Sequence, residues 1–163
     1  MKKTLFILLL PGLFACNRQT AKIKELENRV NQLEINQMNT YKPGFGEMMS
    51  SVQMHHAKLW FAGQNKNWKL ADFEIHEMIE GLENIQKFQK DRPETQLIEM
   101  IDPSLDSIKQ AIELQNFTYF NSSYKSLTQA CNECHRATNF EFNVVKIPKL
   151  QSFGNQDFKA PEL

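Results

Sequence analysis

Apolar side chains recur at alternating steps of three and four residues from about residue 44 to residue 134, a spacing typical of helices that bury one face. Four such stretches follow one another, over 44–63, from Trp68 to Ile85, over 94–115 and from Phe117 to Cys134. Their stripes are Phe45, Met49, Val52, His56 and Leu59; Ala71, Ile75, Met78, Leu82 and Ile85; Leu97, Ile101, Leu105, Ile108 and Ile112; and Phe117, Phe120, Tyr124, Leu127, Cys131 and Cys134. Short connections suit antiparallel neighbours. The pattern predicts an all-α fold, an antiparallel four-helix bundle over residues 44–138.

The third stretch contains a proline. Pro103 has no backbone N–H and clashes with the preceding turn, so a helix either kinks there or restarts. Asp102, directly before it, is a residue type that caps helix N-termini. The sequence leaves both outcomes open.

Two weaker patterns flank the predicted bundle. Residues 20–40 are mostly polar, with Ile23, Leu26, Val30 and Leu33 spaced three, four and three apart. This heptad pattern is shorter than the three or four heptads that indicate a coiled coil. We therefore interpret residues 16–43 as a solvated helical spacer that ends at the Pro43-Gly44 break. After the bundle, residues 139–163 begin with an alternating run and are interpreted as an extended tail packed over the helices.

Composition adds little. The chain has 163 residues, with 19 Lys and Arg against 19 Asp and Glu, so no net charge attracts nucleic acid. Its 12 Phe and 7 Met suit a core around a large flat cofactor, but also an ordinary core. We expect a single domain after the spacer and no nucleic-acid partner.

The N-terminus is typical of an export signal. Met1-Lys2-Lys3 is basic, the run from Thr4 to Ala15 is apolar but too short to span a bilayer, and Cys16 follows. The segment Leu13-Phe14-Ala15-Cys16 resembles a bacterial lipobox. That resemblance implies a lipoprotein signal peptide over residues 1–15, lipidation at Cys16, and an exported chain anchored to a membrane and facing the periplasm or cell surface. A signal that leaves Cys16 free is the alternative.

The other two cysteines form the most specific motif. Cys131-Asn132-Glu133-Cys134-His135 has the C-x-x-C-H spacing that attaches haem c through two thioethers and ligates its iron through the histidine. On a helix these three side chains share one face, and the stripe places that face in the core. We expect Cys131 and Cys134 to hold one haem c and His135 to be an axial ligand.

Three other interpretations compete with this one. A thioredoxin-like motif opens a helix after a strand, whereas these cysteines close a helix in an all-helical chain. A structural zinc site needs four ligands, and no second C-x-x-C pair is present. A plain disulfide remains open, although it gives His135 no role.

A chain of four predicted helices with C-x-x-C-H near the end of the last resembles the class II c-type cytochromes, the cytochrome c′ group, over residues 44–138. The segment Phe120-x3-Tyr124-x2-Leu127-x3-Cys131-x2-Cys134-His135 carries most of the likeness. The resemblance implies a haem-binding bundle that binds small gases in some relatives and often forms homodimers. Two features depart from the family. The tail extends beyond the motif, and the usual basic residue a few positions after the histidine is missing, with Arg136 adjacent instead. The tail is therefore expected to shield a haem edge and to alter which partners approach.

The residue on the other side of the iron decides the chemistry. A Met or His ligand there favours electron transfer, and an apolar residue leaves a position open for a gas. The start of the first helix lies near His135 in an antiparallel bundle, which makes Met49 the first candidate and Met48 another. His55 and His56 lie about two turns deeper, where a histidine on an apolar face is more often a hydrogen-bonded core residue. Either is a further candidate for the sixth ligand if the helix starts before Gly44.

The leading functional hypothesis is a c-type cytochrome, not an enzyme, that exchanges single electrons with redox partner proteins of the bacterial cell envelope. The alternative is a gas-binding or gas-sensing haemoprotein with an open sixth iron position. A third interpretation is a lipid-anchored helical interaction module whose two cysteines form a disulfide.

Overall fold

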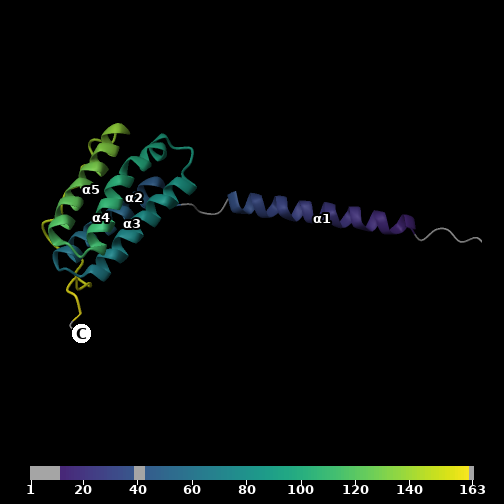
Figure 1. Cartoon of the computed structure of the whole chain (residues 1–163). Coiled ribbons are helices and arrows are strands. Elements are labelled where there is room, and N and C mark those ends of the chain that lie inside the picture. Colours follow the sequence, from purple (N-terminus) through teal and green to yellow (C-terminus); the bar gives the residue numbers. More distant parts are fainter. Residues whose placement is uncertain (1–11, 39–42, 162–163) are drawn as a thin grey trace, which may run out of the picture. The chain divides into compact units, whose positions relative to one another are not determined.

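The protein is described by a computed structural model covering residues 12–38 and 43–161, with side chains for 19–37 and 43–161. Most of the signal peptide predicted over residues 1–15 lies outside the described residues, as does the side chain of Cys16. Within these ranges the chain forms five α-helices and one 3-10 helix, without strands (Figure 1). The predicted all-α class is confirmed. No helix in the described part has both the length and the apolar character needed to cross a membrane.

The chain divides into two units between Lys42 and Pro43. The first contains α1 (Gly12–Met38), whose described side chains are exposed to solvent. This helix begins within the predicted signal peptide and covers most of the predicted spacer.

The second unit contains α2 (Phe45–Gln64), α3 (Trp68–Phe88), the 3-10 helix η1 (Pro93–Ile101), α4 (Asp102–Glu113) and α5 (Phe117–Ala137). Helix α2 packs on α3 and α5, and α4 packs on the same two helices. The 3-10 helix contacts α3, α4 and α5. These elements lie side by side in Figure 1.

Two turns of the same kind join α2 to α3 and α4 to α5. In each, a residue with positive φ ends the first helix, Lys66 at 52° and Gln115 at 50°. The next residue is an asparagine whose side chain caps the second helix: Asn67 accepts from the N–H of Leu70, and Asn116 from that of Tyr119. The N–H groups of both asparagines also bond back into the preceding helix, as in a Schellman motif. These local interactions explain why the connections are so short.

The core consists largely of the predicted stripes. All five predicted positions of α3 are buried, as are Val52, His56 and Leu59 of α2 and Phe120, Tyr124 and Leu127 of α5. The ring of Phe120 lies directly against Gly63, so that no larger side chain fits there without a shift. The helical periodicity therefore located most of the packing faces correctly.

The third stretch differs from the prediction. The chain restarts as an α-helix at Asp102 but runs as a 3-10 helix before it, and the Asp102 side chain makes no capping hydrogen bond. A 3-10 helix repeats every three residues, so Thr95, Ile98 and Ile101 face the core. Leu97, which was placed on the stripe by α-helical spacing, is 37% exposed instead.

Residues 139–161, called the tail below, contain turns and irregular backbone. Contacts along its length hold the tail to the helices, as two examples show. The side chain of Asn132 accepts from the N–H of Val145 at 2.8 Å and donates to its carbonyl oxygen at 2.9 Å. Further on, the Phe158 ring is buried and packs against Phe61.

Candidate functional site

The C-x-x-C-H motif occupies the last turns of α5. Thr138 caps the C-terminus of this helix. Its hydroxyl group lies 2.8 Å from the carbonyl oxygen of Cys134 and 3.1 Å from that of His135. Cys134 is buried, whereas Cys131 and His135 are partly exposed. As the i, i+3, i+4 spacing requires, the three side chains lie on one face of the helix and line one cavity.

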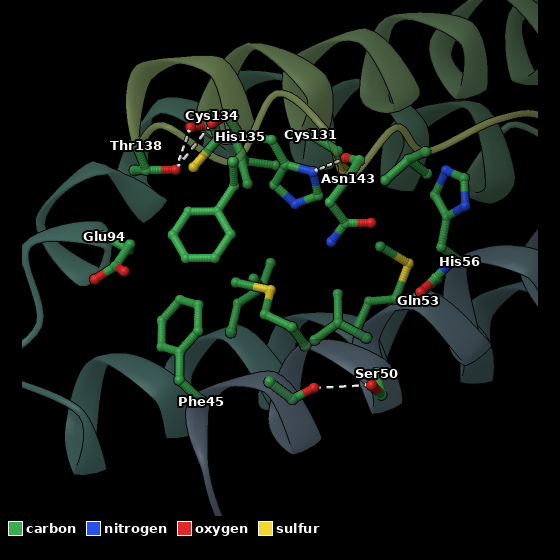
Figure 2. A pocket seen from close by; sticks show the side chains of 18 residues that line it. Phe45, Ser50, Gln53, His56, Glu94, Cys131, Cys134, His135, Thr138 and Asn143 are labelled. Atoms are coloured by element: carbon green, nitrogen blue, oxygen red, sulfur yellow. Dashed lines mark hydrogen bonds between the residues drawn. The ribbon is translucent and has the colours of Figure 1, made fainter.

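This cavity lies between α5, α2, α3, η1 and the tail, and its volume is about 990 Å³ including the open mouth. Most of the wall is apolar: Phe45, Met49, Val52, Met78, Leu82, Ile101, Phe140 and Val145. Figure 2 shows His56 and Glu94 at opposite ends, with the His135 ring between them pointing into the space. The apolar wall suits a ligand with a largely hydrophobic surface.

His135 is held in a defined orientation by the tail. Its Nδ1–H donates to the carbonyl oxygen of Asn143 at 2.6 Å. The Nε2 atom then carries the lone pair, which is the form in which a histidine ligates a metal. Histidines that bind metals usually donate their other N–H to a carbonyl or carboxylate in this way, because the bond fixes the ring and its tautomer. His135 is thus arranged as an axial ligand would be.

The two cysteines lack the character of reactive thiols. Burial, and then the neighbouring Cys134, raises the pKa of Cys131 to about 12, and burial also raises the pKa of Cys134. Catalytic cysteines of thioredoxin-like sites have lowered pKa values instead. Among the described residues there is also no group of three or more His, Cys, Asp or Glu that could hold a metal ion by itself. Both observations weigh against the thiol-redox and zinc interpretations.

Of the four proposed sixth ligands, Met49 and His56 line the cavity, while Met48 and His55 do not. Met48 packs instead against the core. The Nδ1 of His55 lies 2.7 Å from Oε2 of Glu74, a fully buried carboxylate on α3, and its Nε2 lies 4.0 Å from Glu77. The His55 side chain therefore links α2 to α3.

His56 is a hydrogen-bonded core residue. Thr128 donates its only hydroxyl proton to the carbonyl oxygen of Tyr124 at 2.9 Å, so it accepts from the Nε2–H of His56 at 3.0 Å. The Tyr124 hydroxyl faces Nδ1 at 3.0 Å and also donates to the His56 carbonyl at 2.8 Å. The single Tyr124 hydroxyl proton serves one of these two acceptors at a time, so Nε2 is bonded and Nδ1 faces a hydroxyl group. Burial lowers the pKa of His56 to about 4. Ligation of a metal by His56 would require breaking the bond to Thr128 or moving the Tyr124 hydroxyl aside.

Several cavity residues were missed by the sequence argument. Met78 lies on a stripe that was interpreted only as core, yet its side chain lines the cavity. Glu94 is buried at one end, where the Arg92 guanidinium at 2.6 Å holds the pKa of the Glu94 carboxyl below its usual range. Asn143 contributes a backbone carbonyl, for which no side-chain pattern gives a signal.

Comparisons with known proteins give no match, neither to a model of a protein family nor to a curated protein nor to a solved structure. The functional argument therefore depends on the residues and geometry of the cavity.

Proposed function

We propose that this protein is a c-type cytochrome that carries single electrons at the bacterial cell envelope, rather than an enzyme. One haem c would be attached to Cys131 and Cys134 and ligated by His135. The observation that carries the proposal is that these three side chains line one apolar cavity in which the Nδ1 of His135 is already hydrogen-bonded. We further propose that α2, α3, α4 and α5 form an antiparallel four-helix bundle similar to that of the cytochrome c′ group.

The cavity's own chemistry fits a haem group. Its apolar wall would contact the macrocycle, and its open side would leave the polar edge of the group toward solvent. When bound, the group supplies an iron that alternates between the ferrous and ferric states. The apolar wall excludes water, and the Asn143 carbonyl orients His135. The tail, which provides Phe140, Asn143 and Val145, covers part of the site, as the expected shielding of a haem edge requires.

We propose Met49 as the sixth ligand. It lies on α2 on the wall of the same cavity as His135, whereas His55 and His56 already have partners. A thioether ligand opposite a histidine raises the reduction potential relative to ligation by histidine alone and closes the iron to other molecules. Met78 is the other thioether on the wall and the natural second candidate.

Gas binding is the alternative function, and one observation favours it. Both ring nitrogens of His56 have a hydrogen-bond partner nearby, so the thioethers of Met49 and Met78 are the side chains left on the described cavity wall that could act as a sixth ligand. A thioether that does not reach the iron would leave a pocket open to nitric oxide or carbon monoxide.

The proposed location at a membrane surface is based on the N-terminal sequence. A lipid on Cys16 would hold the protein on a membrane that faces the periplasm or the cell surface, where redox partner proteins would exchange electrons with it.

The visible spectrum of reduced, exported and haem-matured protein, with and without carbon monoxide, separates the two functions. We expect a low-spin spectrum that the gas does not change. Met49→Leu should become high-spin and responsive to carbon monoxide, while Met48→Leu, the matched control one residue away, should behave like the wild type. A wild-type spectrum that is high-spin and shifts with the gas would favour gas binding. Absence of a haem band would refute both functions.

A further inference from the structure

Helix α1 carries an apolar stripe that is separate from the haem cavity and unexplained by the proposed function. Ile23, Leu26, Val30 and Leu33 lie along one face and are between 49% and 66% exposed. In heptad lettering, the β-branched residues Ile23 and Val30 occupy position a, and the two leucines occupy position d. β-Branched residues at a with leucine at d are the combination that favours two-stranded parallel coiled coils.

The charges on both sides of this stripe are sorted by sign. Lys22 and Arg29 occupy position g, and Glu27 and Glu34 occupy position e. In a parallel pair of helices, position g of one copy lies beside position e of the next heptad of the other. Lys22 then meets Glu27 of the second copy, and Arg29 meets Glu34 of the second copy. An antiparallel pair would instead place like charges together, because g then faces g and e faces e.

The surface of α1 also has the shape that such packing needs. A shallow depression on the helix is lined by Ile23, Leu26, Glu27, Val30 and Asn31. The first four are residues i, i+3, i+4 and i+7, the set that forms a hole in knobs-into-holes packing. In a parallel, in-register pair, Leu26 of the second copy would be the knob that fills it.

From these three features we infer that this face of α1 docks on α1 of a second copy of the chain, forming a parallel two-stranded coiled coil. Charge complementarity selects the second copy as occupant, since the positive g row of one helix matches the negative e row of an identical helix. The apolar positions select two strands rather than three. The inference concerns α1 alone and does not depend on haem binding.

The interface spans only two heptads. Its stability should therefore increase with any other interaction that holds two chains close together. Lipidation at Cys16, as proposed above, would place the helices in one membrane with their N-termini aligned. That arrangement enforces the parallel orientation and raises the effective concentration of one helix for the other.

Cysteine cross-linking of the exported, full-length protein in its membrane tests the inference. Residues that face each other at position d come close enough for a disulfide, which needs Cα atoms no more than about 7 Å apart. We expect Leu26→Cys to form a disulfide-linked dimer for most of the protein. Asn28→Cys, at the outward position f, should form at least fivefold less. Both variants keep the same other cysteines, so a difference reports on α1 whether or not haem is attached.

Charge reversal provides the second measurement. In the Leu26→Cys background, E27K/E34K makes both flanks positive, and K22E/R29E makes both negative. Each variant alone should lose the cross-link, whereas coexpression of the two with different tags should restore a mixed dimer. Equal cross-linking at positions 26 and 28, cross-linking to another protein, a trimer, or charge variants that cross-link like the parent would each overturn the inference.

Discussion

The strongest quantitative prediction concerns the pH dependence of stability that His56 imposes. Folding removes this imidazole from water, and burial lowers its pKa from 6.5 to about 4. The His56 ring of the unfolded chain therefore binds a proton as the pH falls through about 6.5, whereas the ring in the native state binds it only near pH 4. Unfolding is favoured as the pH falls through this window, and the contribution of His56 to stability is complete only above pH 6.5.

The size of the effect follows from the two pKa values. They differ by about 2.5, and one pKa unit corresponds to about 1.4 kcal/mol, so the free energy of unfolding should fall by about 3 kcal/mol between pH 7 and pH 4. His56→Gln keeps a donor for Thr128 and an acceptor for Tyr124 but cannot take up the proton. This variant should lack the 3 kcal/mol loss.

Guanidinium denaturation of the haem-matured protein, followed by far-UV circular dichroism at several pH values, measures the effect. Subtracting the free energy of unfolding of His56→Gln from that of the wild type at each pH removes the contribution of every other titratable group. His76→Gln, which alters an exposed histidine of α3, is the matched control and should retain the wild-type pH dependence. Parallel curves for wild type and His56→Gln would refute the reasoning.

Two further predictions concern packing and the tail. Gly63→Ala should lower the free energy of unfolding by about 2 kcal/mol, because its Cβ would overlap the Phe120 ring, whose Cε2 atom would lie 2.7 Å away. Gly46→Ala, in the first turn of the same helix with nothing within 4 Å of the added Cβ, should leave it nearly unchanged, and equal effects in denaturation would contradict this account. Asn132→Ala removes both hydrogen bonds to Val145, so limited proteolysis should cleave the tail faster than in wild type; unchanged cleavage would show that these bonds do not hold it.

The sequence was most informative where a regular period reports burial. The stripes of α2, α3 and α5 follow the 3.6-residue repeat, and most of the side chains that they selected are buried, with Phe117 at the start of α5 the exposed exception. The prediction that Leu97 is buried was wrong for a local reason. Residues 97, 98, 100 and 101 are all apolar and fit either a 3-10 or an α-helical repeat. The burial of Phe158 had no periodic signal, since the tail is irregular.

At the site, the sequence located the residues that a helix presents but not those whose role depends on tertiary contacts. His55 and His56 are adjacent in sequence, yet they point about 100° apart around the helix axis, so only His56 lines the cavity. The partner of His55, Glu74, lies beside the buried stripe of α3, and a carboxylate at that position was a usable signal. The Asn143 carbonyl that orients His135 belongs to the backbone and could only be found in the structure.

The most direct test of the central claim, covalent haem at Cys131 and Cys134, is the intact mass of the exported and haem-matured chain after denaturation. We predict the mass of the mature polypeptide with its Cys16 modification plus one haem, retained under denaturing conditions, with the haem mass lost when Cys131 and Cys134 are replaced by serine. A mass equal to the polypeptide alone, or lower by the two hydrogens that a disulfide removes, would contradict the account.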